Sequence, residues 1–538
     1  MMLDNAEIPL AAGLRSLTLL DREQRAAAMH CTDPKRKPGT ADCSQSIWLS
    51  LFFDGTGNNF DYDTPKLKQS NVSRLFSSHQ LENDETGRYP IYIPGLGTPF
   101  PEIGERTYSD LGLAVGVGGE KRLKWARQQF DDRIRKAKAR ARNPRQPIRT
   151  INASLFGFSR GAALARAFAV RIAKDCKKVG DGWQYQGYPI RLYFMGLMDT
   201  VASAGLPSSA KYLDRSPIVK IATESFFPSL SSALTFVPKD GHYAWAKNLK
   251  IPAMVEQCVH YVAAHEVRDS FPLDSVRDGN HYPPNCIEVI YPGVHSDIGG
   301  GYAPGEQTRS LTDDEKLSQV PLLHMYRAAL AAGVPFRAFN EMDVDTKSTF
   351  ALSQRTVALF DAYQARAHAS GPVEKVVAQH LYPLYLARSY LSKLTNDEAA
   401  RARVPAAKQV LAQTGNNDLV KDVEAELAKI TAGGNAVNRA SGDAETKKLN
   451  GKSLSLREAM LARAYEDVSL ITGSSSTRQS LLDFFDYLVH DSVAGFGADM
   501  SKLQNWRMMY FGDQGYEPEN DWNLAKEERT NESTGATA

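Results

Sequence analysis

The chain has 538 residues, of which 42% are hydrophobic and 23% charged, with a formal net charge of +2. This balance provides no basic surface for nucleic acid and no polybasic membrane anchor, so we expect no nucleic-acid partner. No run approaches the roughly 18 uninterrupted apolar residues of a membrane helix. The five cysteines lack C-x-x-C spacing and indicate reduced thiols, so they predict neither a zinc site nor a disulfide framework.

The first 44 residues are of mixed character and predict a helical or partly ordered extension. Their short apolar piece, 8–14, follows Asp4 and Glu7, where a secretory signal requires lysine or arginine. We therefore predict a protein that is made in the cytoplasm without a signal peptide.

Strand and helix patterns alternate from residue 45 to about residue 330. This alternation predicts right-handed βαβ units, and hence an α/β fold with a mostly parallel, α/β-hydrolase-like sheet flanked by helices. Ligands bind at the carboxyl ends of the strands in such sheets, so we expect the functional residues there. The expected strands are 47–53, 90–93, 151–156, 190–197 and 287–291, and the expected helices are 72–79, 119–141, 162–170 and 253–265.

The remaining chain divides into less regular parts. Residues 205–280 are a candidate cleft-lining insertion, with apolar residues at 226–230 well placed to line a cleft. Residues 331–538 are mainly helical and are a candidate lid, membrane-docking or partner-binding module. Within them, the polar stretch 431–452 predicts a flexible connection. The segment 381–391 favours a core helix broken at a proline over an interfacial element.

The most informative motif is Gly157-Phe158-Ser159-Arg160-Gly161, a G-x-S-x-G sequence between an expected strand and an expected helix. This context is that of the nucleophile elbow, in which a sharp turn exposes the serine hydroxyl. The glycines permit the strained turn, and the dipole of the following helix points at a developing oxyanion. The motif therefore predicts that Ser159 is a nucleophile.

A serine nucleophile needs a base, and the base needs an orienting carboxylate. Asp199 and His295 each follow a later expected strand. The order of serine, acid and histidine along the chain is that of α/β hydrolases. We therefore predict Asp199 as the acid and His295 as the base, against the alternatives of a turn aspartate and a structural loop histidine.

Four further residues are candidates for supporting roles. His265 is the second choice for the base, although Glu266 and Arg268 beside it favour a bracing role for that segment. His490 lies in a His-Asp-Ser trio whose side chains diverge, so we expect it to pack near the site. Asp54 and Asp297 follow expected strands and complete this group.

The oxyanion hole is predicted to combine the backbone N–H of Arg160 with that of Gly55 or Thr56 in the loop after the first strand. The same loop argues against a haloacid-dehalogenase-type phosphotransferase, because Phe52 stands where that nucleophilic aspartate would be. No Walker loop or dinucleotide fingerprint is complete either. We therefore predict no cofactor and no metal.

Six motifs follow one another along the chain: LFFDGTGNN (51–59), GFSRGAALAR (157–166), MDTVAS (198–203), HYVAAHEVRDSF (260–271), PGVHSDIGGGY (292–302) and VHDS (489–492). Together and in this order they resemble the type VI secretion phospholipase effectors of the first lipase-effector family. The resemblance covers roughly 45–330, with an isolated match near 490, and implies an α/β-hydrolase catalytic domain with Ser159, Asp199 and His295 as its catalytic residues. It also implies a membrane phospholipid substrate, a secretion spike or adaptor protein as carrier, a cognate immunity protein, and delivery to the periplasm of target bacteria.

These features together predict an antibacterial phospholipase A that hydrolyses acyl esters of glycerophospholipids through an acyl-enzyme. Two other functions stay open at this point. One is a carboxylesterase on small soluble esters, and the other is a non-catalytic binding protein that retains the fold.

Overall fold

The computed structural model describes residues 45–109, 118–140, 148–202, 244–367, 369–393, 398–470, 476–494 and 506–516. The N-terminal extension and residues 226–230 lie outside these ranges.

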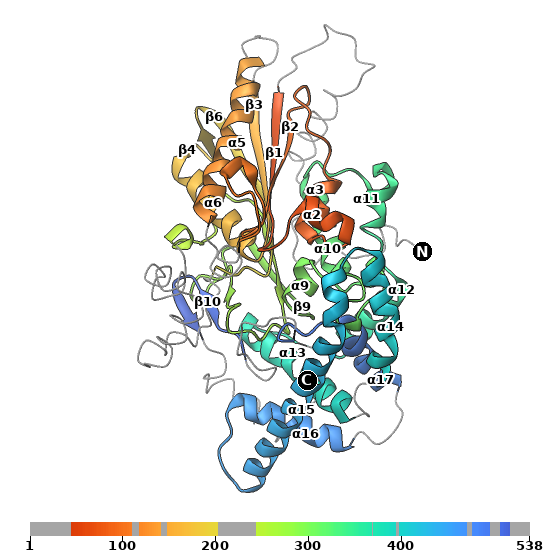
Figure 1. The fold of residues 1–538 in the computed structure, drawn as a ribbon. Helices are drawn as coiled ribbons and strands as arrows, with labels where there is room; N and C mark the ends of the chain where they lie inside the picture. Colours follow the sequence, from red (N-terminus) through yellow and green to blue (C-terminus); the bar gives the residue numbers. More distant parts are fainter. Residues whose placement is uncertain are drawn as a thin grey trace, which may run out of the picture.

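An eight-stranded sheet forms the centre of the described molecule (Figure 1). Its parallel part confirms the predicted mostly parallel sheet. A hairpin of β4 (Lys177–Val179) and β5 (Gly182–Tyr185) pairs through β5 with the first residues of β6 (Tyr188–Met198) in antiparallel orientation. The parallel strands lie in the order β2 (Arg88–Ile93), β1 (Gln45–Phe53), β3 (Ile148–Phe158), β6 (Tyr188–Met198), β7 (Cys258–Ala263) and β9 (Cys286–Tyr291).

Helices cover both faces of the sheet because its side chains alternate between two apolar surfaces. On one face, Leu49 and Leu51 pack with α5 (Gly119–Arg140) and α6 (Arg160–Asp175). On the other face, Trp48 and Phe52 belong to the same core as α3 (Asn71–Ser78) and α10 (Gln319–Ala332). Figure 1 shows the two pairs of helices on opposite sides of the strands.

Residues beyond 330 are mainly helical, as predicted, and Figure 1 shows them at one end and side of the sheet. A small second sheet joins β8 (Leu273–Asp274) to β10 (Met509–Phe511) and β11 (Gln514–Tyr516). The helices are α11 (Val344–Ser348), α12 (Gln354–Gln364), α13 (Val373–Lys393), α14 (Glu398–Gln413), α15 (Asn417–Leu449), α16 (Leu456–Leu470) and α17 (Ser476–Asp483), with a π-helical turn at Phe484–Leu488. Two short helices, α2 (Phe60–Asp63) and α9 (His295–Gly299), lie in loops after strands.

The expected helix at 253–265 is wrong, because residues 258–263 form β7. All six residues of this strand are buried, and several are β-branched or aromatic, which favours a strand between two others. A short apolar run of this kind has no decisive periodicity, and here the space between β6 and β9 decides its structure. The candidate insertion 205–280 therefore contains a strand of the central sheet.

The flexible connection expected at 431–452 is also wrong, because α15 continues to Leu449. Its buried residues include Gly434, Ser441 and Ala444, which share one face of the helix at near-helical spacing. These small side chains let α15 pack closely against α13 and α16. Tertiary packing thus overrides the weak helix propensity of the glycines.

The segment 381–391 lies inside α13, and the helix continues through Pro383. Tyr385 is fully buried, and its hydroxyl accepts a hydrogen bond from Trp506 Nε1 at 2.6 Å. The Tyr382 hydroxyl donates to Asp467. The segment is thus part of the core, as the sequence favoured, but the break expected at Pro383 is wrong. Within the described ranges, no helix has the length and apolar character to cross a membrane.

Candidate active site

Ser159 occupies a sharp turn between the end of β3 and the start of α6, as the motif predicts. Its φ of 57° and ψ of −128° are strained for a residue with a side chain. Glycine is required on both sides. A Cβ on Gly161 would lie 2.2 Å from the Phe53 carbonyl oxygen, and one on Gly157 would lie 2.5 Å from Ala162 Cα. The close packing of strand, turn and helix therefore fixes the elbow.

Asp199 follows β6 directly and is completely buried. Its backbone N–H donates to the Tyr261 carbonyl at 2.6 Å, and its Oδ1 accepts the Ala263 N–H at 2.9 Å. These bonds tie the residue to β7, the neighbouring strand. The carboxylate is thus held at the carboxyl edge of the sheet.

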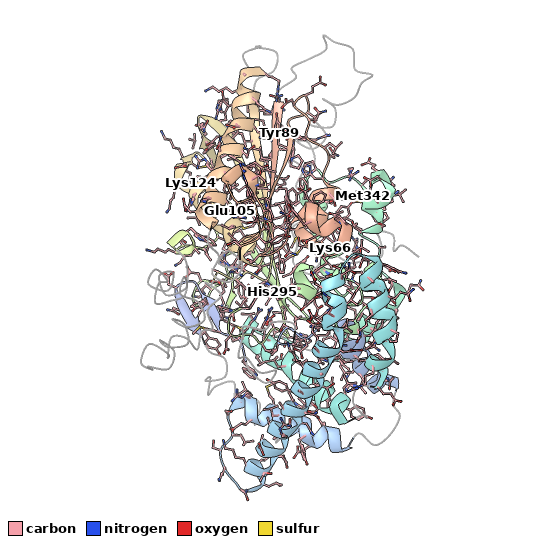
Figure 2. All side chains as sticks on the ribbon, in the orientation of Figure 1. Lys66, Tyr89, Glu105, Lys124, His295 and Met342 are labelled. Carbon is pink, nitrogen blue, oxygen red and sulfur yellow. The ribbon has the colours of Figure 1, made fainter. Side chains whose placement is uncertain are left out.

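His295 begins α9, just after β9, and lies at the lower end of the sheet in Figure 2. Its Nδ1 lies 2.6 Å from Asp199 Oδ2, so we assign the Nδ1–H as donor to the carboxylate. The ring contacts Phe158 at a centroid separation of 4.6 Å and Phe271 at 5.0 Å. Burial lowers the pKa of His295, while the bond to Asp199 opposes this shift.

The Nε2 of His295 is buried, and no described residue forms a hydrogen bond with it. The bond from Ser159 Oγ is therefore not formed in this structure. Such bonds are often long in free enzymes and tighten when substrate binds. Phe158, which precedes Ser159, already packs against the imidazole, so the structure brings Ser159, Asp199 and His295 to one edge of the sheet.

Arg507 is a site residue that the sequence reasoning missed. Its Nη1 and Nη2 donate to Asp199 Oδ2 and Oδ1, each at 2.8 Å. Burial alone would raise the pKa of Asp199, but the charge of Arg507 and the hydrogen bonds from His295 and Arg507 hold it far below its ordinary value. Arg507 belongs to no motif. The run of apolar residues in 506–511 could have indicated a buried segment, but not the partner of the arginine.

The loop after β1 lies against the elbow, where a Cβ on Gly55 would be 2.4 Å from the Phe158 ring. Asp54 Oδ1 accepts the Gly55 N–H at 2.7 Å and the Ser70 hydroxyl, and its Oδ2 accepts the Tyr92 hydroxyl at 2.5 Å. Burial raises the pKa of Asp54 to about 7. Because the Gly55 N–H is directed at Asp54, Thr56 is the better candidate for the second oxyanion donor beside Arg160.

His265 is held by structural contacts. Its Nδ1 accepts the Gly293 N–H at 3.0 Å, and its Nε2 lies 3.1 Å from both the Tyr363 hydroxyl and the His380 carbonyl. Burial lowers its pKa well below the ordinary value. Since both ring nitrogens are engaged, His265 links the sheet to α12 and α13 and is poorly placed to act as the base.

A second histidine–carboxylate pair lies beside the loop that carries His295. His490 Nδ1 is 2.7 Å from Asp297 Oδ1, and the backbone N–H of His490 donates to Asp297 Oδ2 at 3.2 Å. The His490 ring stacks on Tyr302 with a centroid separation of 3.7 Å. The pair joins the segment 489–492 to the loop after β9.

Glu266 braces the same loop from the end of β7. Its Oε2 accepts the backbone N–H of His295 at 3.3 Å and pairs with Arg268 Nη2 at 2.8 Å. Ser492 Oγ donates to the other carboxylate oxygen at 3.0 Å. Burial would raise the pKa of Glu266, but the Arg268 charge holds it at about 2. Glu266 thus stays ionised and fixes the backbone on which His295 stands.

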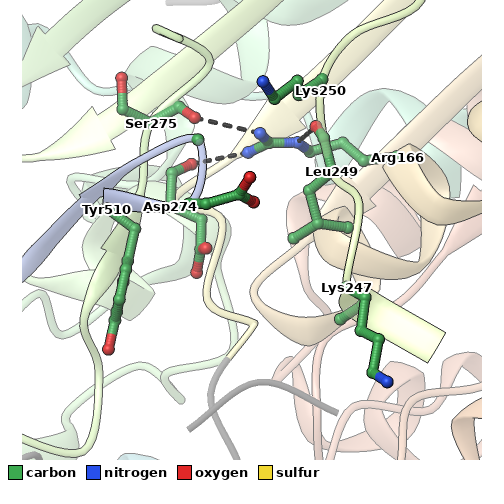
Figure 3. Close-up of a pocket in the computed structure, with 10 residues that line it drawn as sticks. Arg166, Lys247, Leu249, Lys250, Asp274, Ser275 and Tyr510 are labelled. Carbon is green, nitrogen blue, oxygen red and sulfur yellow. Dashed lines mark hydrogen bonds between the residues drawn. The ribbon is translucent and has the colours of Figure 1, made fainter. Parts of the chain in front are cut away.

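A small pocket is lined by Arg166, Asp274 and Ser275, among other residues (Figure 3). It has a volume of about 30 Å³. Arg166 on α6 donates to the carbonyl oxygens of Leu249, Asp274 and Ser275 at 2.7, 2.7 and 3.0 Å. Asp274 in turn accepts the Ala202 N–H at 2.7 Å. The pocket therefore belongs to the scaffold of the Asp199 loop. Within the described ranges, no cluster of histidine, cysteine, aspartate and glutamate is suited to hold a metal.

The model for the catalytic domain of Tle1-like phospholipase effectors of type VI secretion matches residues 48–180 and 179–328. A solved structure of an uncharacterized protein from Pseudomonas aeruginosa aligns with a TM-score of 0.69 at 22% identity, covering 95% of this chain and 85% of that chain. The Tle1 effector bound to the VgrG spike of the type 6 secretion system aligns with a TM-score of 0.40 at 20% identity, covering 65% of this chain and 88% of that chain. No curated protein matches the chain.

Proposed function

Because the chain belongs to the Tle1-like family of type VI secretion phospholipase effectors, we propose that it is a serine phospholipase A acting on acyl esters of membrane glycerophospholipids. One observation carries the proposal. The Asp199–His295 pair, at 2.6 Å, leaves the imidazole Nε2 without a partner at the sheet edge where the strained turn places Ser159. An imidazole in this state has the tautomer and the free lone pair that a general base needs.

In the proposed mechanism, Ser159 Oγ turns toward His295 when substrate binds and attacks the ester carbonyl carbon. His295 Nε2 takes the hydroxyl proton, and the ionised Asp199 stabilises the imidazolium. The backbone N–H groups of Arg160 and Thr56 hold the oxyanion. The tetrahedral intermediate then collapses, and His295 returns the proton to the leaving lysophospholipid oxygen. Water, deprotonated by His295, attacks the acyl carbonyl carbon of the acyl-enzyme. The bond from this carbon to Ser159 Oγ then breaks, His295 returns the proton to Oγ, and the fatty acid leaves.

We also propose that the protein is carried by a secretion spike into the periplasm of target bacteria and that the producing cell holds an immunity protein. The family supports this route, and a solved structure contains the Tle1 effector bound to the VgrG spike. Co-purification of the full chain with the spike protein of its own secretion system tests the carrier. If the two proteins do not associate in the absence or presence of an adaptor, the spike proposal is wrong.

The activity is tested on phosphatidylethanolamine–phosphatidylglycerol vesicles by mass spectrometry of the released fatty acid and lysolipid. Wild type is compared with Ser159→Ala and His295→Ala, and with Ser348→Ala as the control, because Ser348 is an exposed serine of α11. We expect release by wild type and control, and losses on the order of 10⁴-fold or more in the two site variants. Release that survives Ser159→Ala would overturn the mechanism.

Two other outcomes identify the alternatives. Hydrolysis of short soluble esters without release from vesicles would indicate a carboxylesterase. A wild-type Ser159 that does not react with a fluorophosphonate, together with no hydrolysis of either substrate, would indicate a binding protein that retains the fold.

A further inference from the structure

Arg507 lies far along the chain from the residues that it contacts. It is 308 residues from Asp199, and the family match ends at residue 328. Its segment, 506–516, is anchored on both sides of the arginine. Trp506 Nε1 donates to Tyr385 Oη at 2.6 Å, and β10 pairs with β8, whose first residue is Leu273. The arginine is thus delivered to the sheet edge by a docked segment.

The guanidinium holds the Asp199 carboxylate in a two-point fork at 2.8 Å on each oxygen. Its Nη2 also donates to the Ala263 carbonyl at 2.9 Å, which fixes the fork to β7. Both side chains are 0% exposed. The Oδ2 that accepts Nη1 also accepts the His295 Nδ1–H at 2.6 Å. The orientation of the imidazole therefore depends on a carboxylate plane that Arg507 sets.

The Arg507 guanidinium also changes the net charge of the groups around the His295 imidazole. Four other charged groups lie near this histidine: Asp199 on its Nδ1, Glu266 on its backbone N–H, Arg268 on Glu266, and Asp297 two residues along α9. Asp297 is hydrogen-bonded to His490, and the carboxylate of Glu266 is paired with the Arg268 cation. Arg507 offsets the charge of Asp199 in the same way. Without it, an uncompensated buried carboxylate would draw a proton onto His295.

We propose that Arg507 is a positioning residue of the active site, which orients the Asp199 carboxylate and offsets its charge, so that the catalytic machinery extends into the C-terminal segment. The activity readout of this inference rests on the proposed function. The contact between Arg507 and the Asp199–His295 pair does not.

Two substitutions separate charge from orientation. Arg507→Gln removes the charge and the fork, whereas Arg507→Lys keeps a charge but cannot form the fork. The matched control is Arg74→Gln, because Arg74 forms a similar buried fork on Asp313 at 2.8 and 2.7 Å and its other side-chain hydrogen bonds go to Gln319 and Thr349. Circular dichroism and thermal unfolding establish that each variant is folded.

The first readout is the pH dependence of kcat/KM on a soluble ester, whose acid limb reports the protonation of the base in the free enzyme. In Arg507→Gln we expect the acid limb to move up by on the order of one pH unit and kcat/KM to fall on the order of 100-fold. In Arg507→Lys we expect the limb near its wild-type position with kcat/KM reduced by on the order of 10-fold. Arg74→Gln should not move the limb.

The second readout is independent of hydrolysis. The His295 imidazole is titrated by NMR in histidine-labelled protein and assigned with His295→Gln. An upward shift of its midpoint in Arg507→Gln, absent in Arg74→Gln, supports the inference even if wild type cleaves no ester. An unchanged midpoint in folded Arg507→Gln overturns the charge role. If that variant does not fold, wild-type kcat/KM in Arg507→Lys overturns the orienting role.

Discussion

Two histidine–carboxylate pairs share the loop after β9, because His295 belongs to one pair and Asp297 to the other. Their local geometry is nearly the same. Asp199–His295 joins Oδ2 to Nδ1 at 2.6 Å, and Asp297–His490 joins Oδ1 to Nδ1 at 2.7 Å. In both, the imidazole is almost fully buried and its Nε2 has no partner in the described ranges. The pair itself therefore does not identify the base.

The surroundings separate the two pairs. His295 packs against Phe158 of the elbow, and its carboxylate is held by the Arg507 fork. His490 instead stacks on Tyr302, and its carboxylate accepts the backbone N–H of Val294 at 3.0 Å. One pair packs against the residue that precedes Ser159, whereas the other joins the segment 489–492 to the loop after β9. A catalytic assignment thus depends on what faces the free nitrogen.

The largest expected contrast comes from matched substitutions of the two carboxylates. Asp199→Asn disturbs the tautomer of His295, so we expect kcat to fall on the order of 10⁴-fold. Asp297→Asn should cost less than about 10-fold in activity but lower the free energy of unfolding by about 1–3 kcal/mol, because buried hydrogen bonds to His490 and Val294 are disturbed. Steady-state kinetics and urea unfolding measure both. Equal losses of activity would remove the distinction between the pairs.

A second, intermediate effect is the pH dependence of the wild type. His295 must be neutral to accept the serine proton, and burial lowers its pKa below the ordinary value of 6.5 even though Asp199 opposes the shift. His295 therefore becomes protonated, and activity is lost, only below pH 6.5. We expect kcat/KM to stay level through neutral pH and to fall only on the acid side of that value. An acid limb above neutral pH would contradict this account of the base.

The smallest expected effect concerns Asp54, in the loop beside the elbow. Burial raises its pKa from 3.8 to about 7, so the folded protein binds this proton more tightly than the unfolded chain does. Its contribution to the free energy of unfolding falls as pH rises from 3.8 toward about 7. The free energy of unfolding of Asp54→Asn, measured relative to that of wild type, should therefore rise by on the order of 2 kcal/mol between about pH 5 and about pH 8. A pH-independent difference in urea unfolding would show that Asp54 does not titrate in this range.

The sequence indicated the turn at Ser159 and the loops that carry Asp199 and His295, because residues next to each of them in the chain determine its structure. The glycines around Ser159 and the strands before Asp199 and His295 are adjacent in sequence to the residues they position. A parallel sheet then brings these loops to one edge. The structure agrees with the sequence wherever a short segment and the sheet topology are sufficient.

The sequence failed where distant packing decides the structure. Residues 258–263 form a strand because the gap between β6 and β9 accepts one, and α15 stays helical through its glycines because α13 and α16 pack against it. Arg507 could not be assigned from its neighbours, since its partner lies 308 residues away. Contacts of this range leave no periodic pattern in the chain.

We propose that His295, and not His490, activates Ser159. The direct test is the rate of labelling by a fluorophosphonate in wild type, His295→Gln and His490→Gln, with the modified residue located by peptide mapping. We predict labelling at Ser159 in wild type, a rate in His490→Gln within about 10-fold of it, and a loss in His295→Gln on the order of 10³-fold or more. Labelling at another residue would show that Ser159 is not the nucleophile, and an equal loss in the two histidine variants would show that His295 is not its specific base.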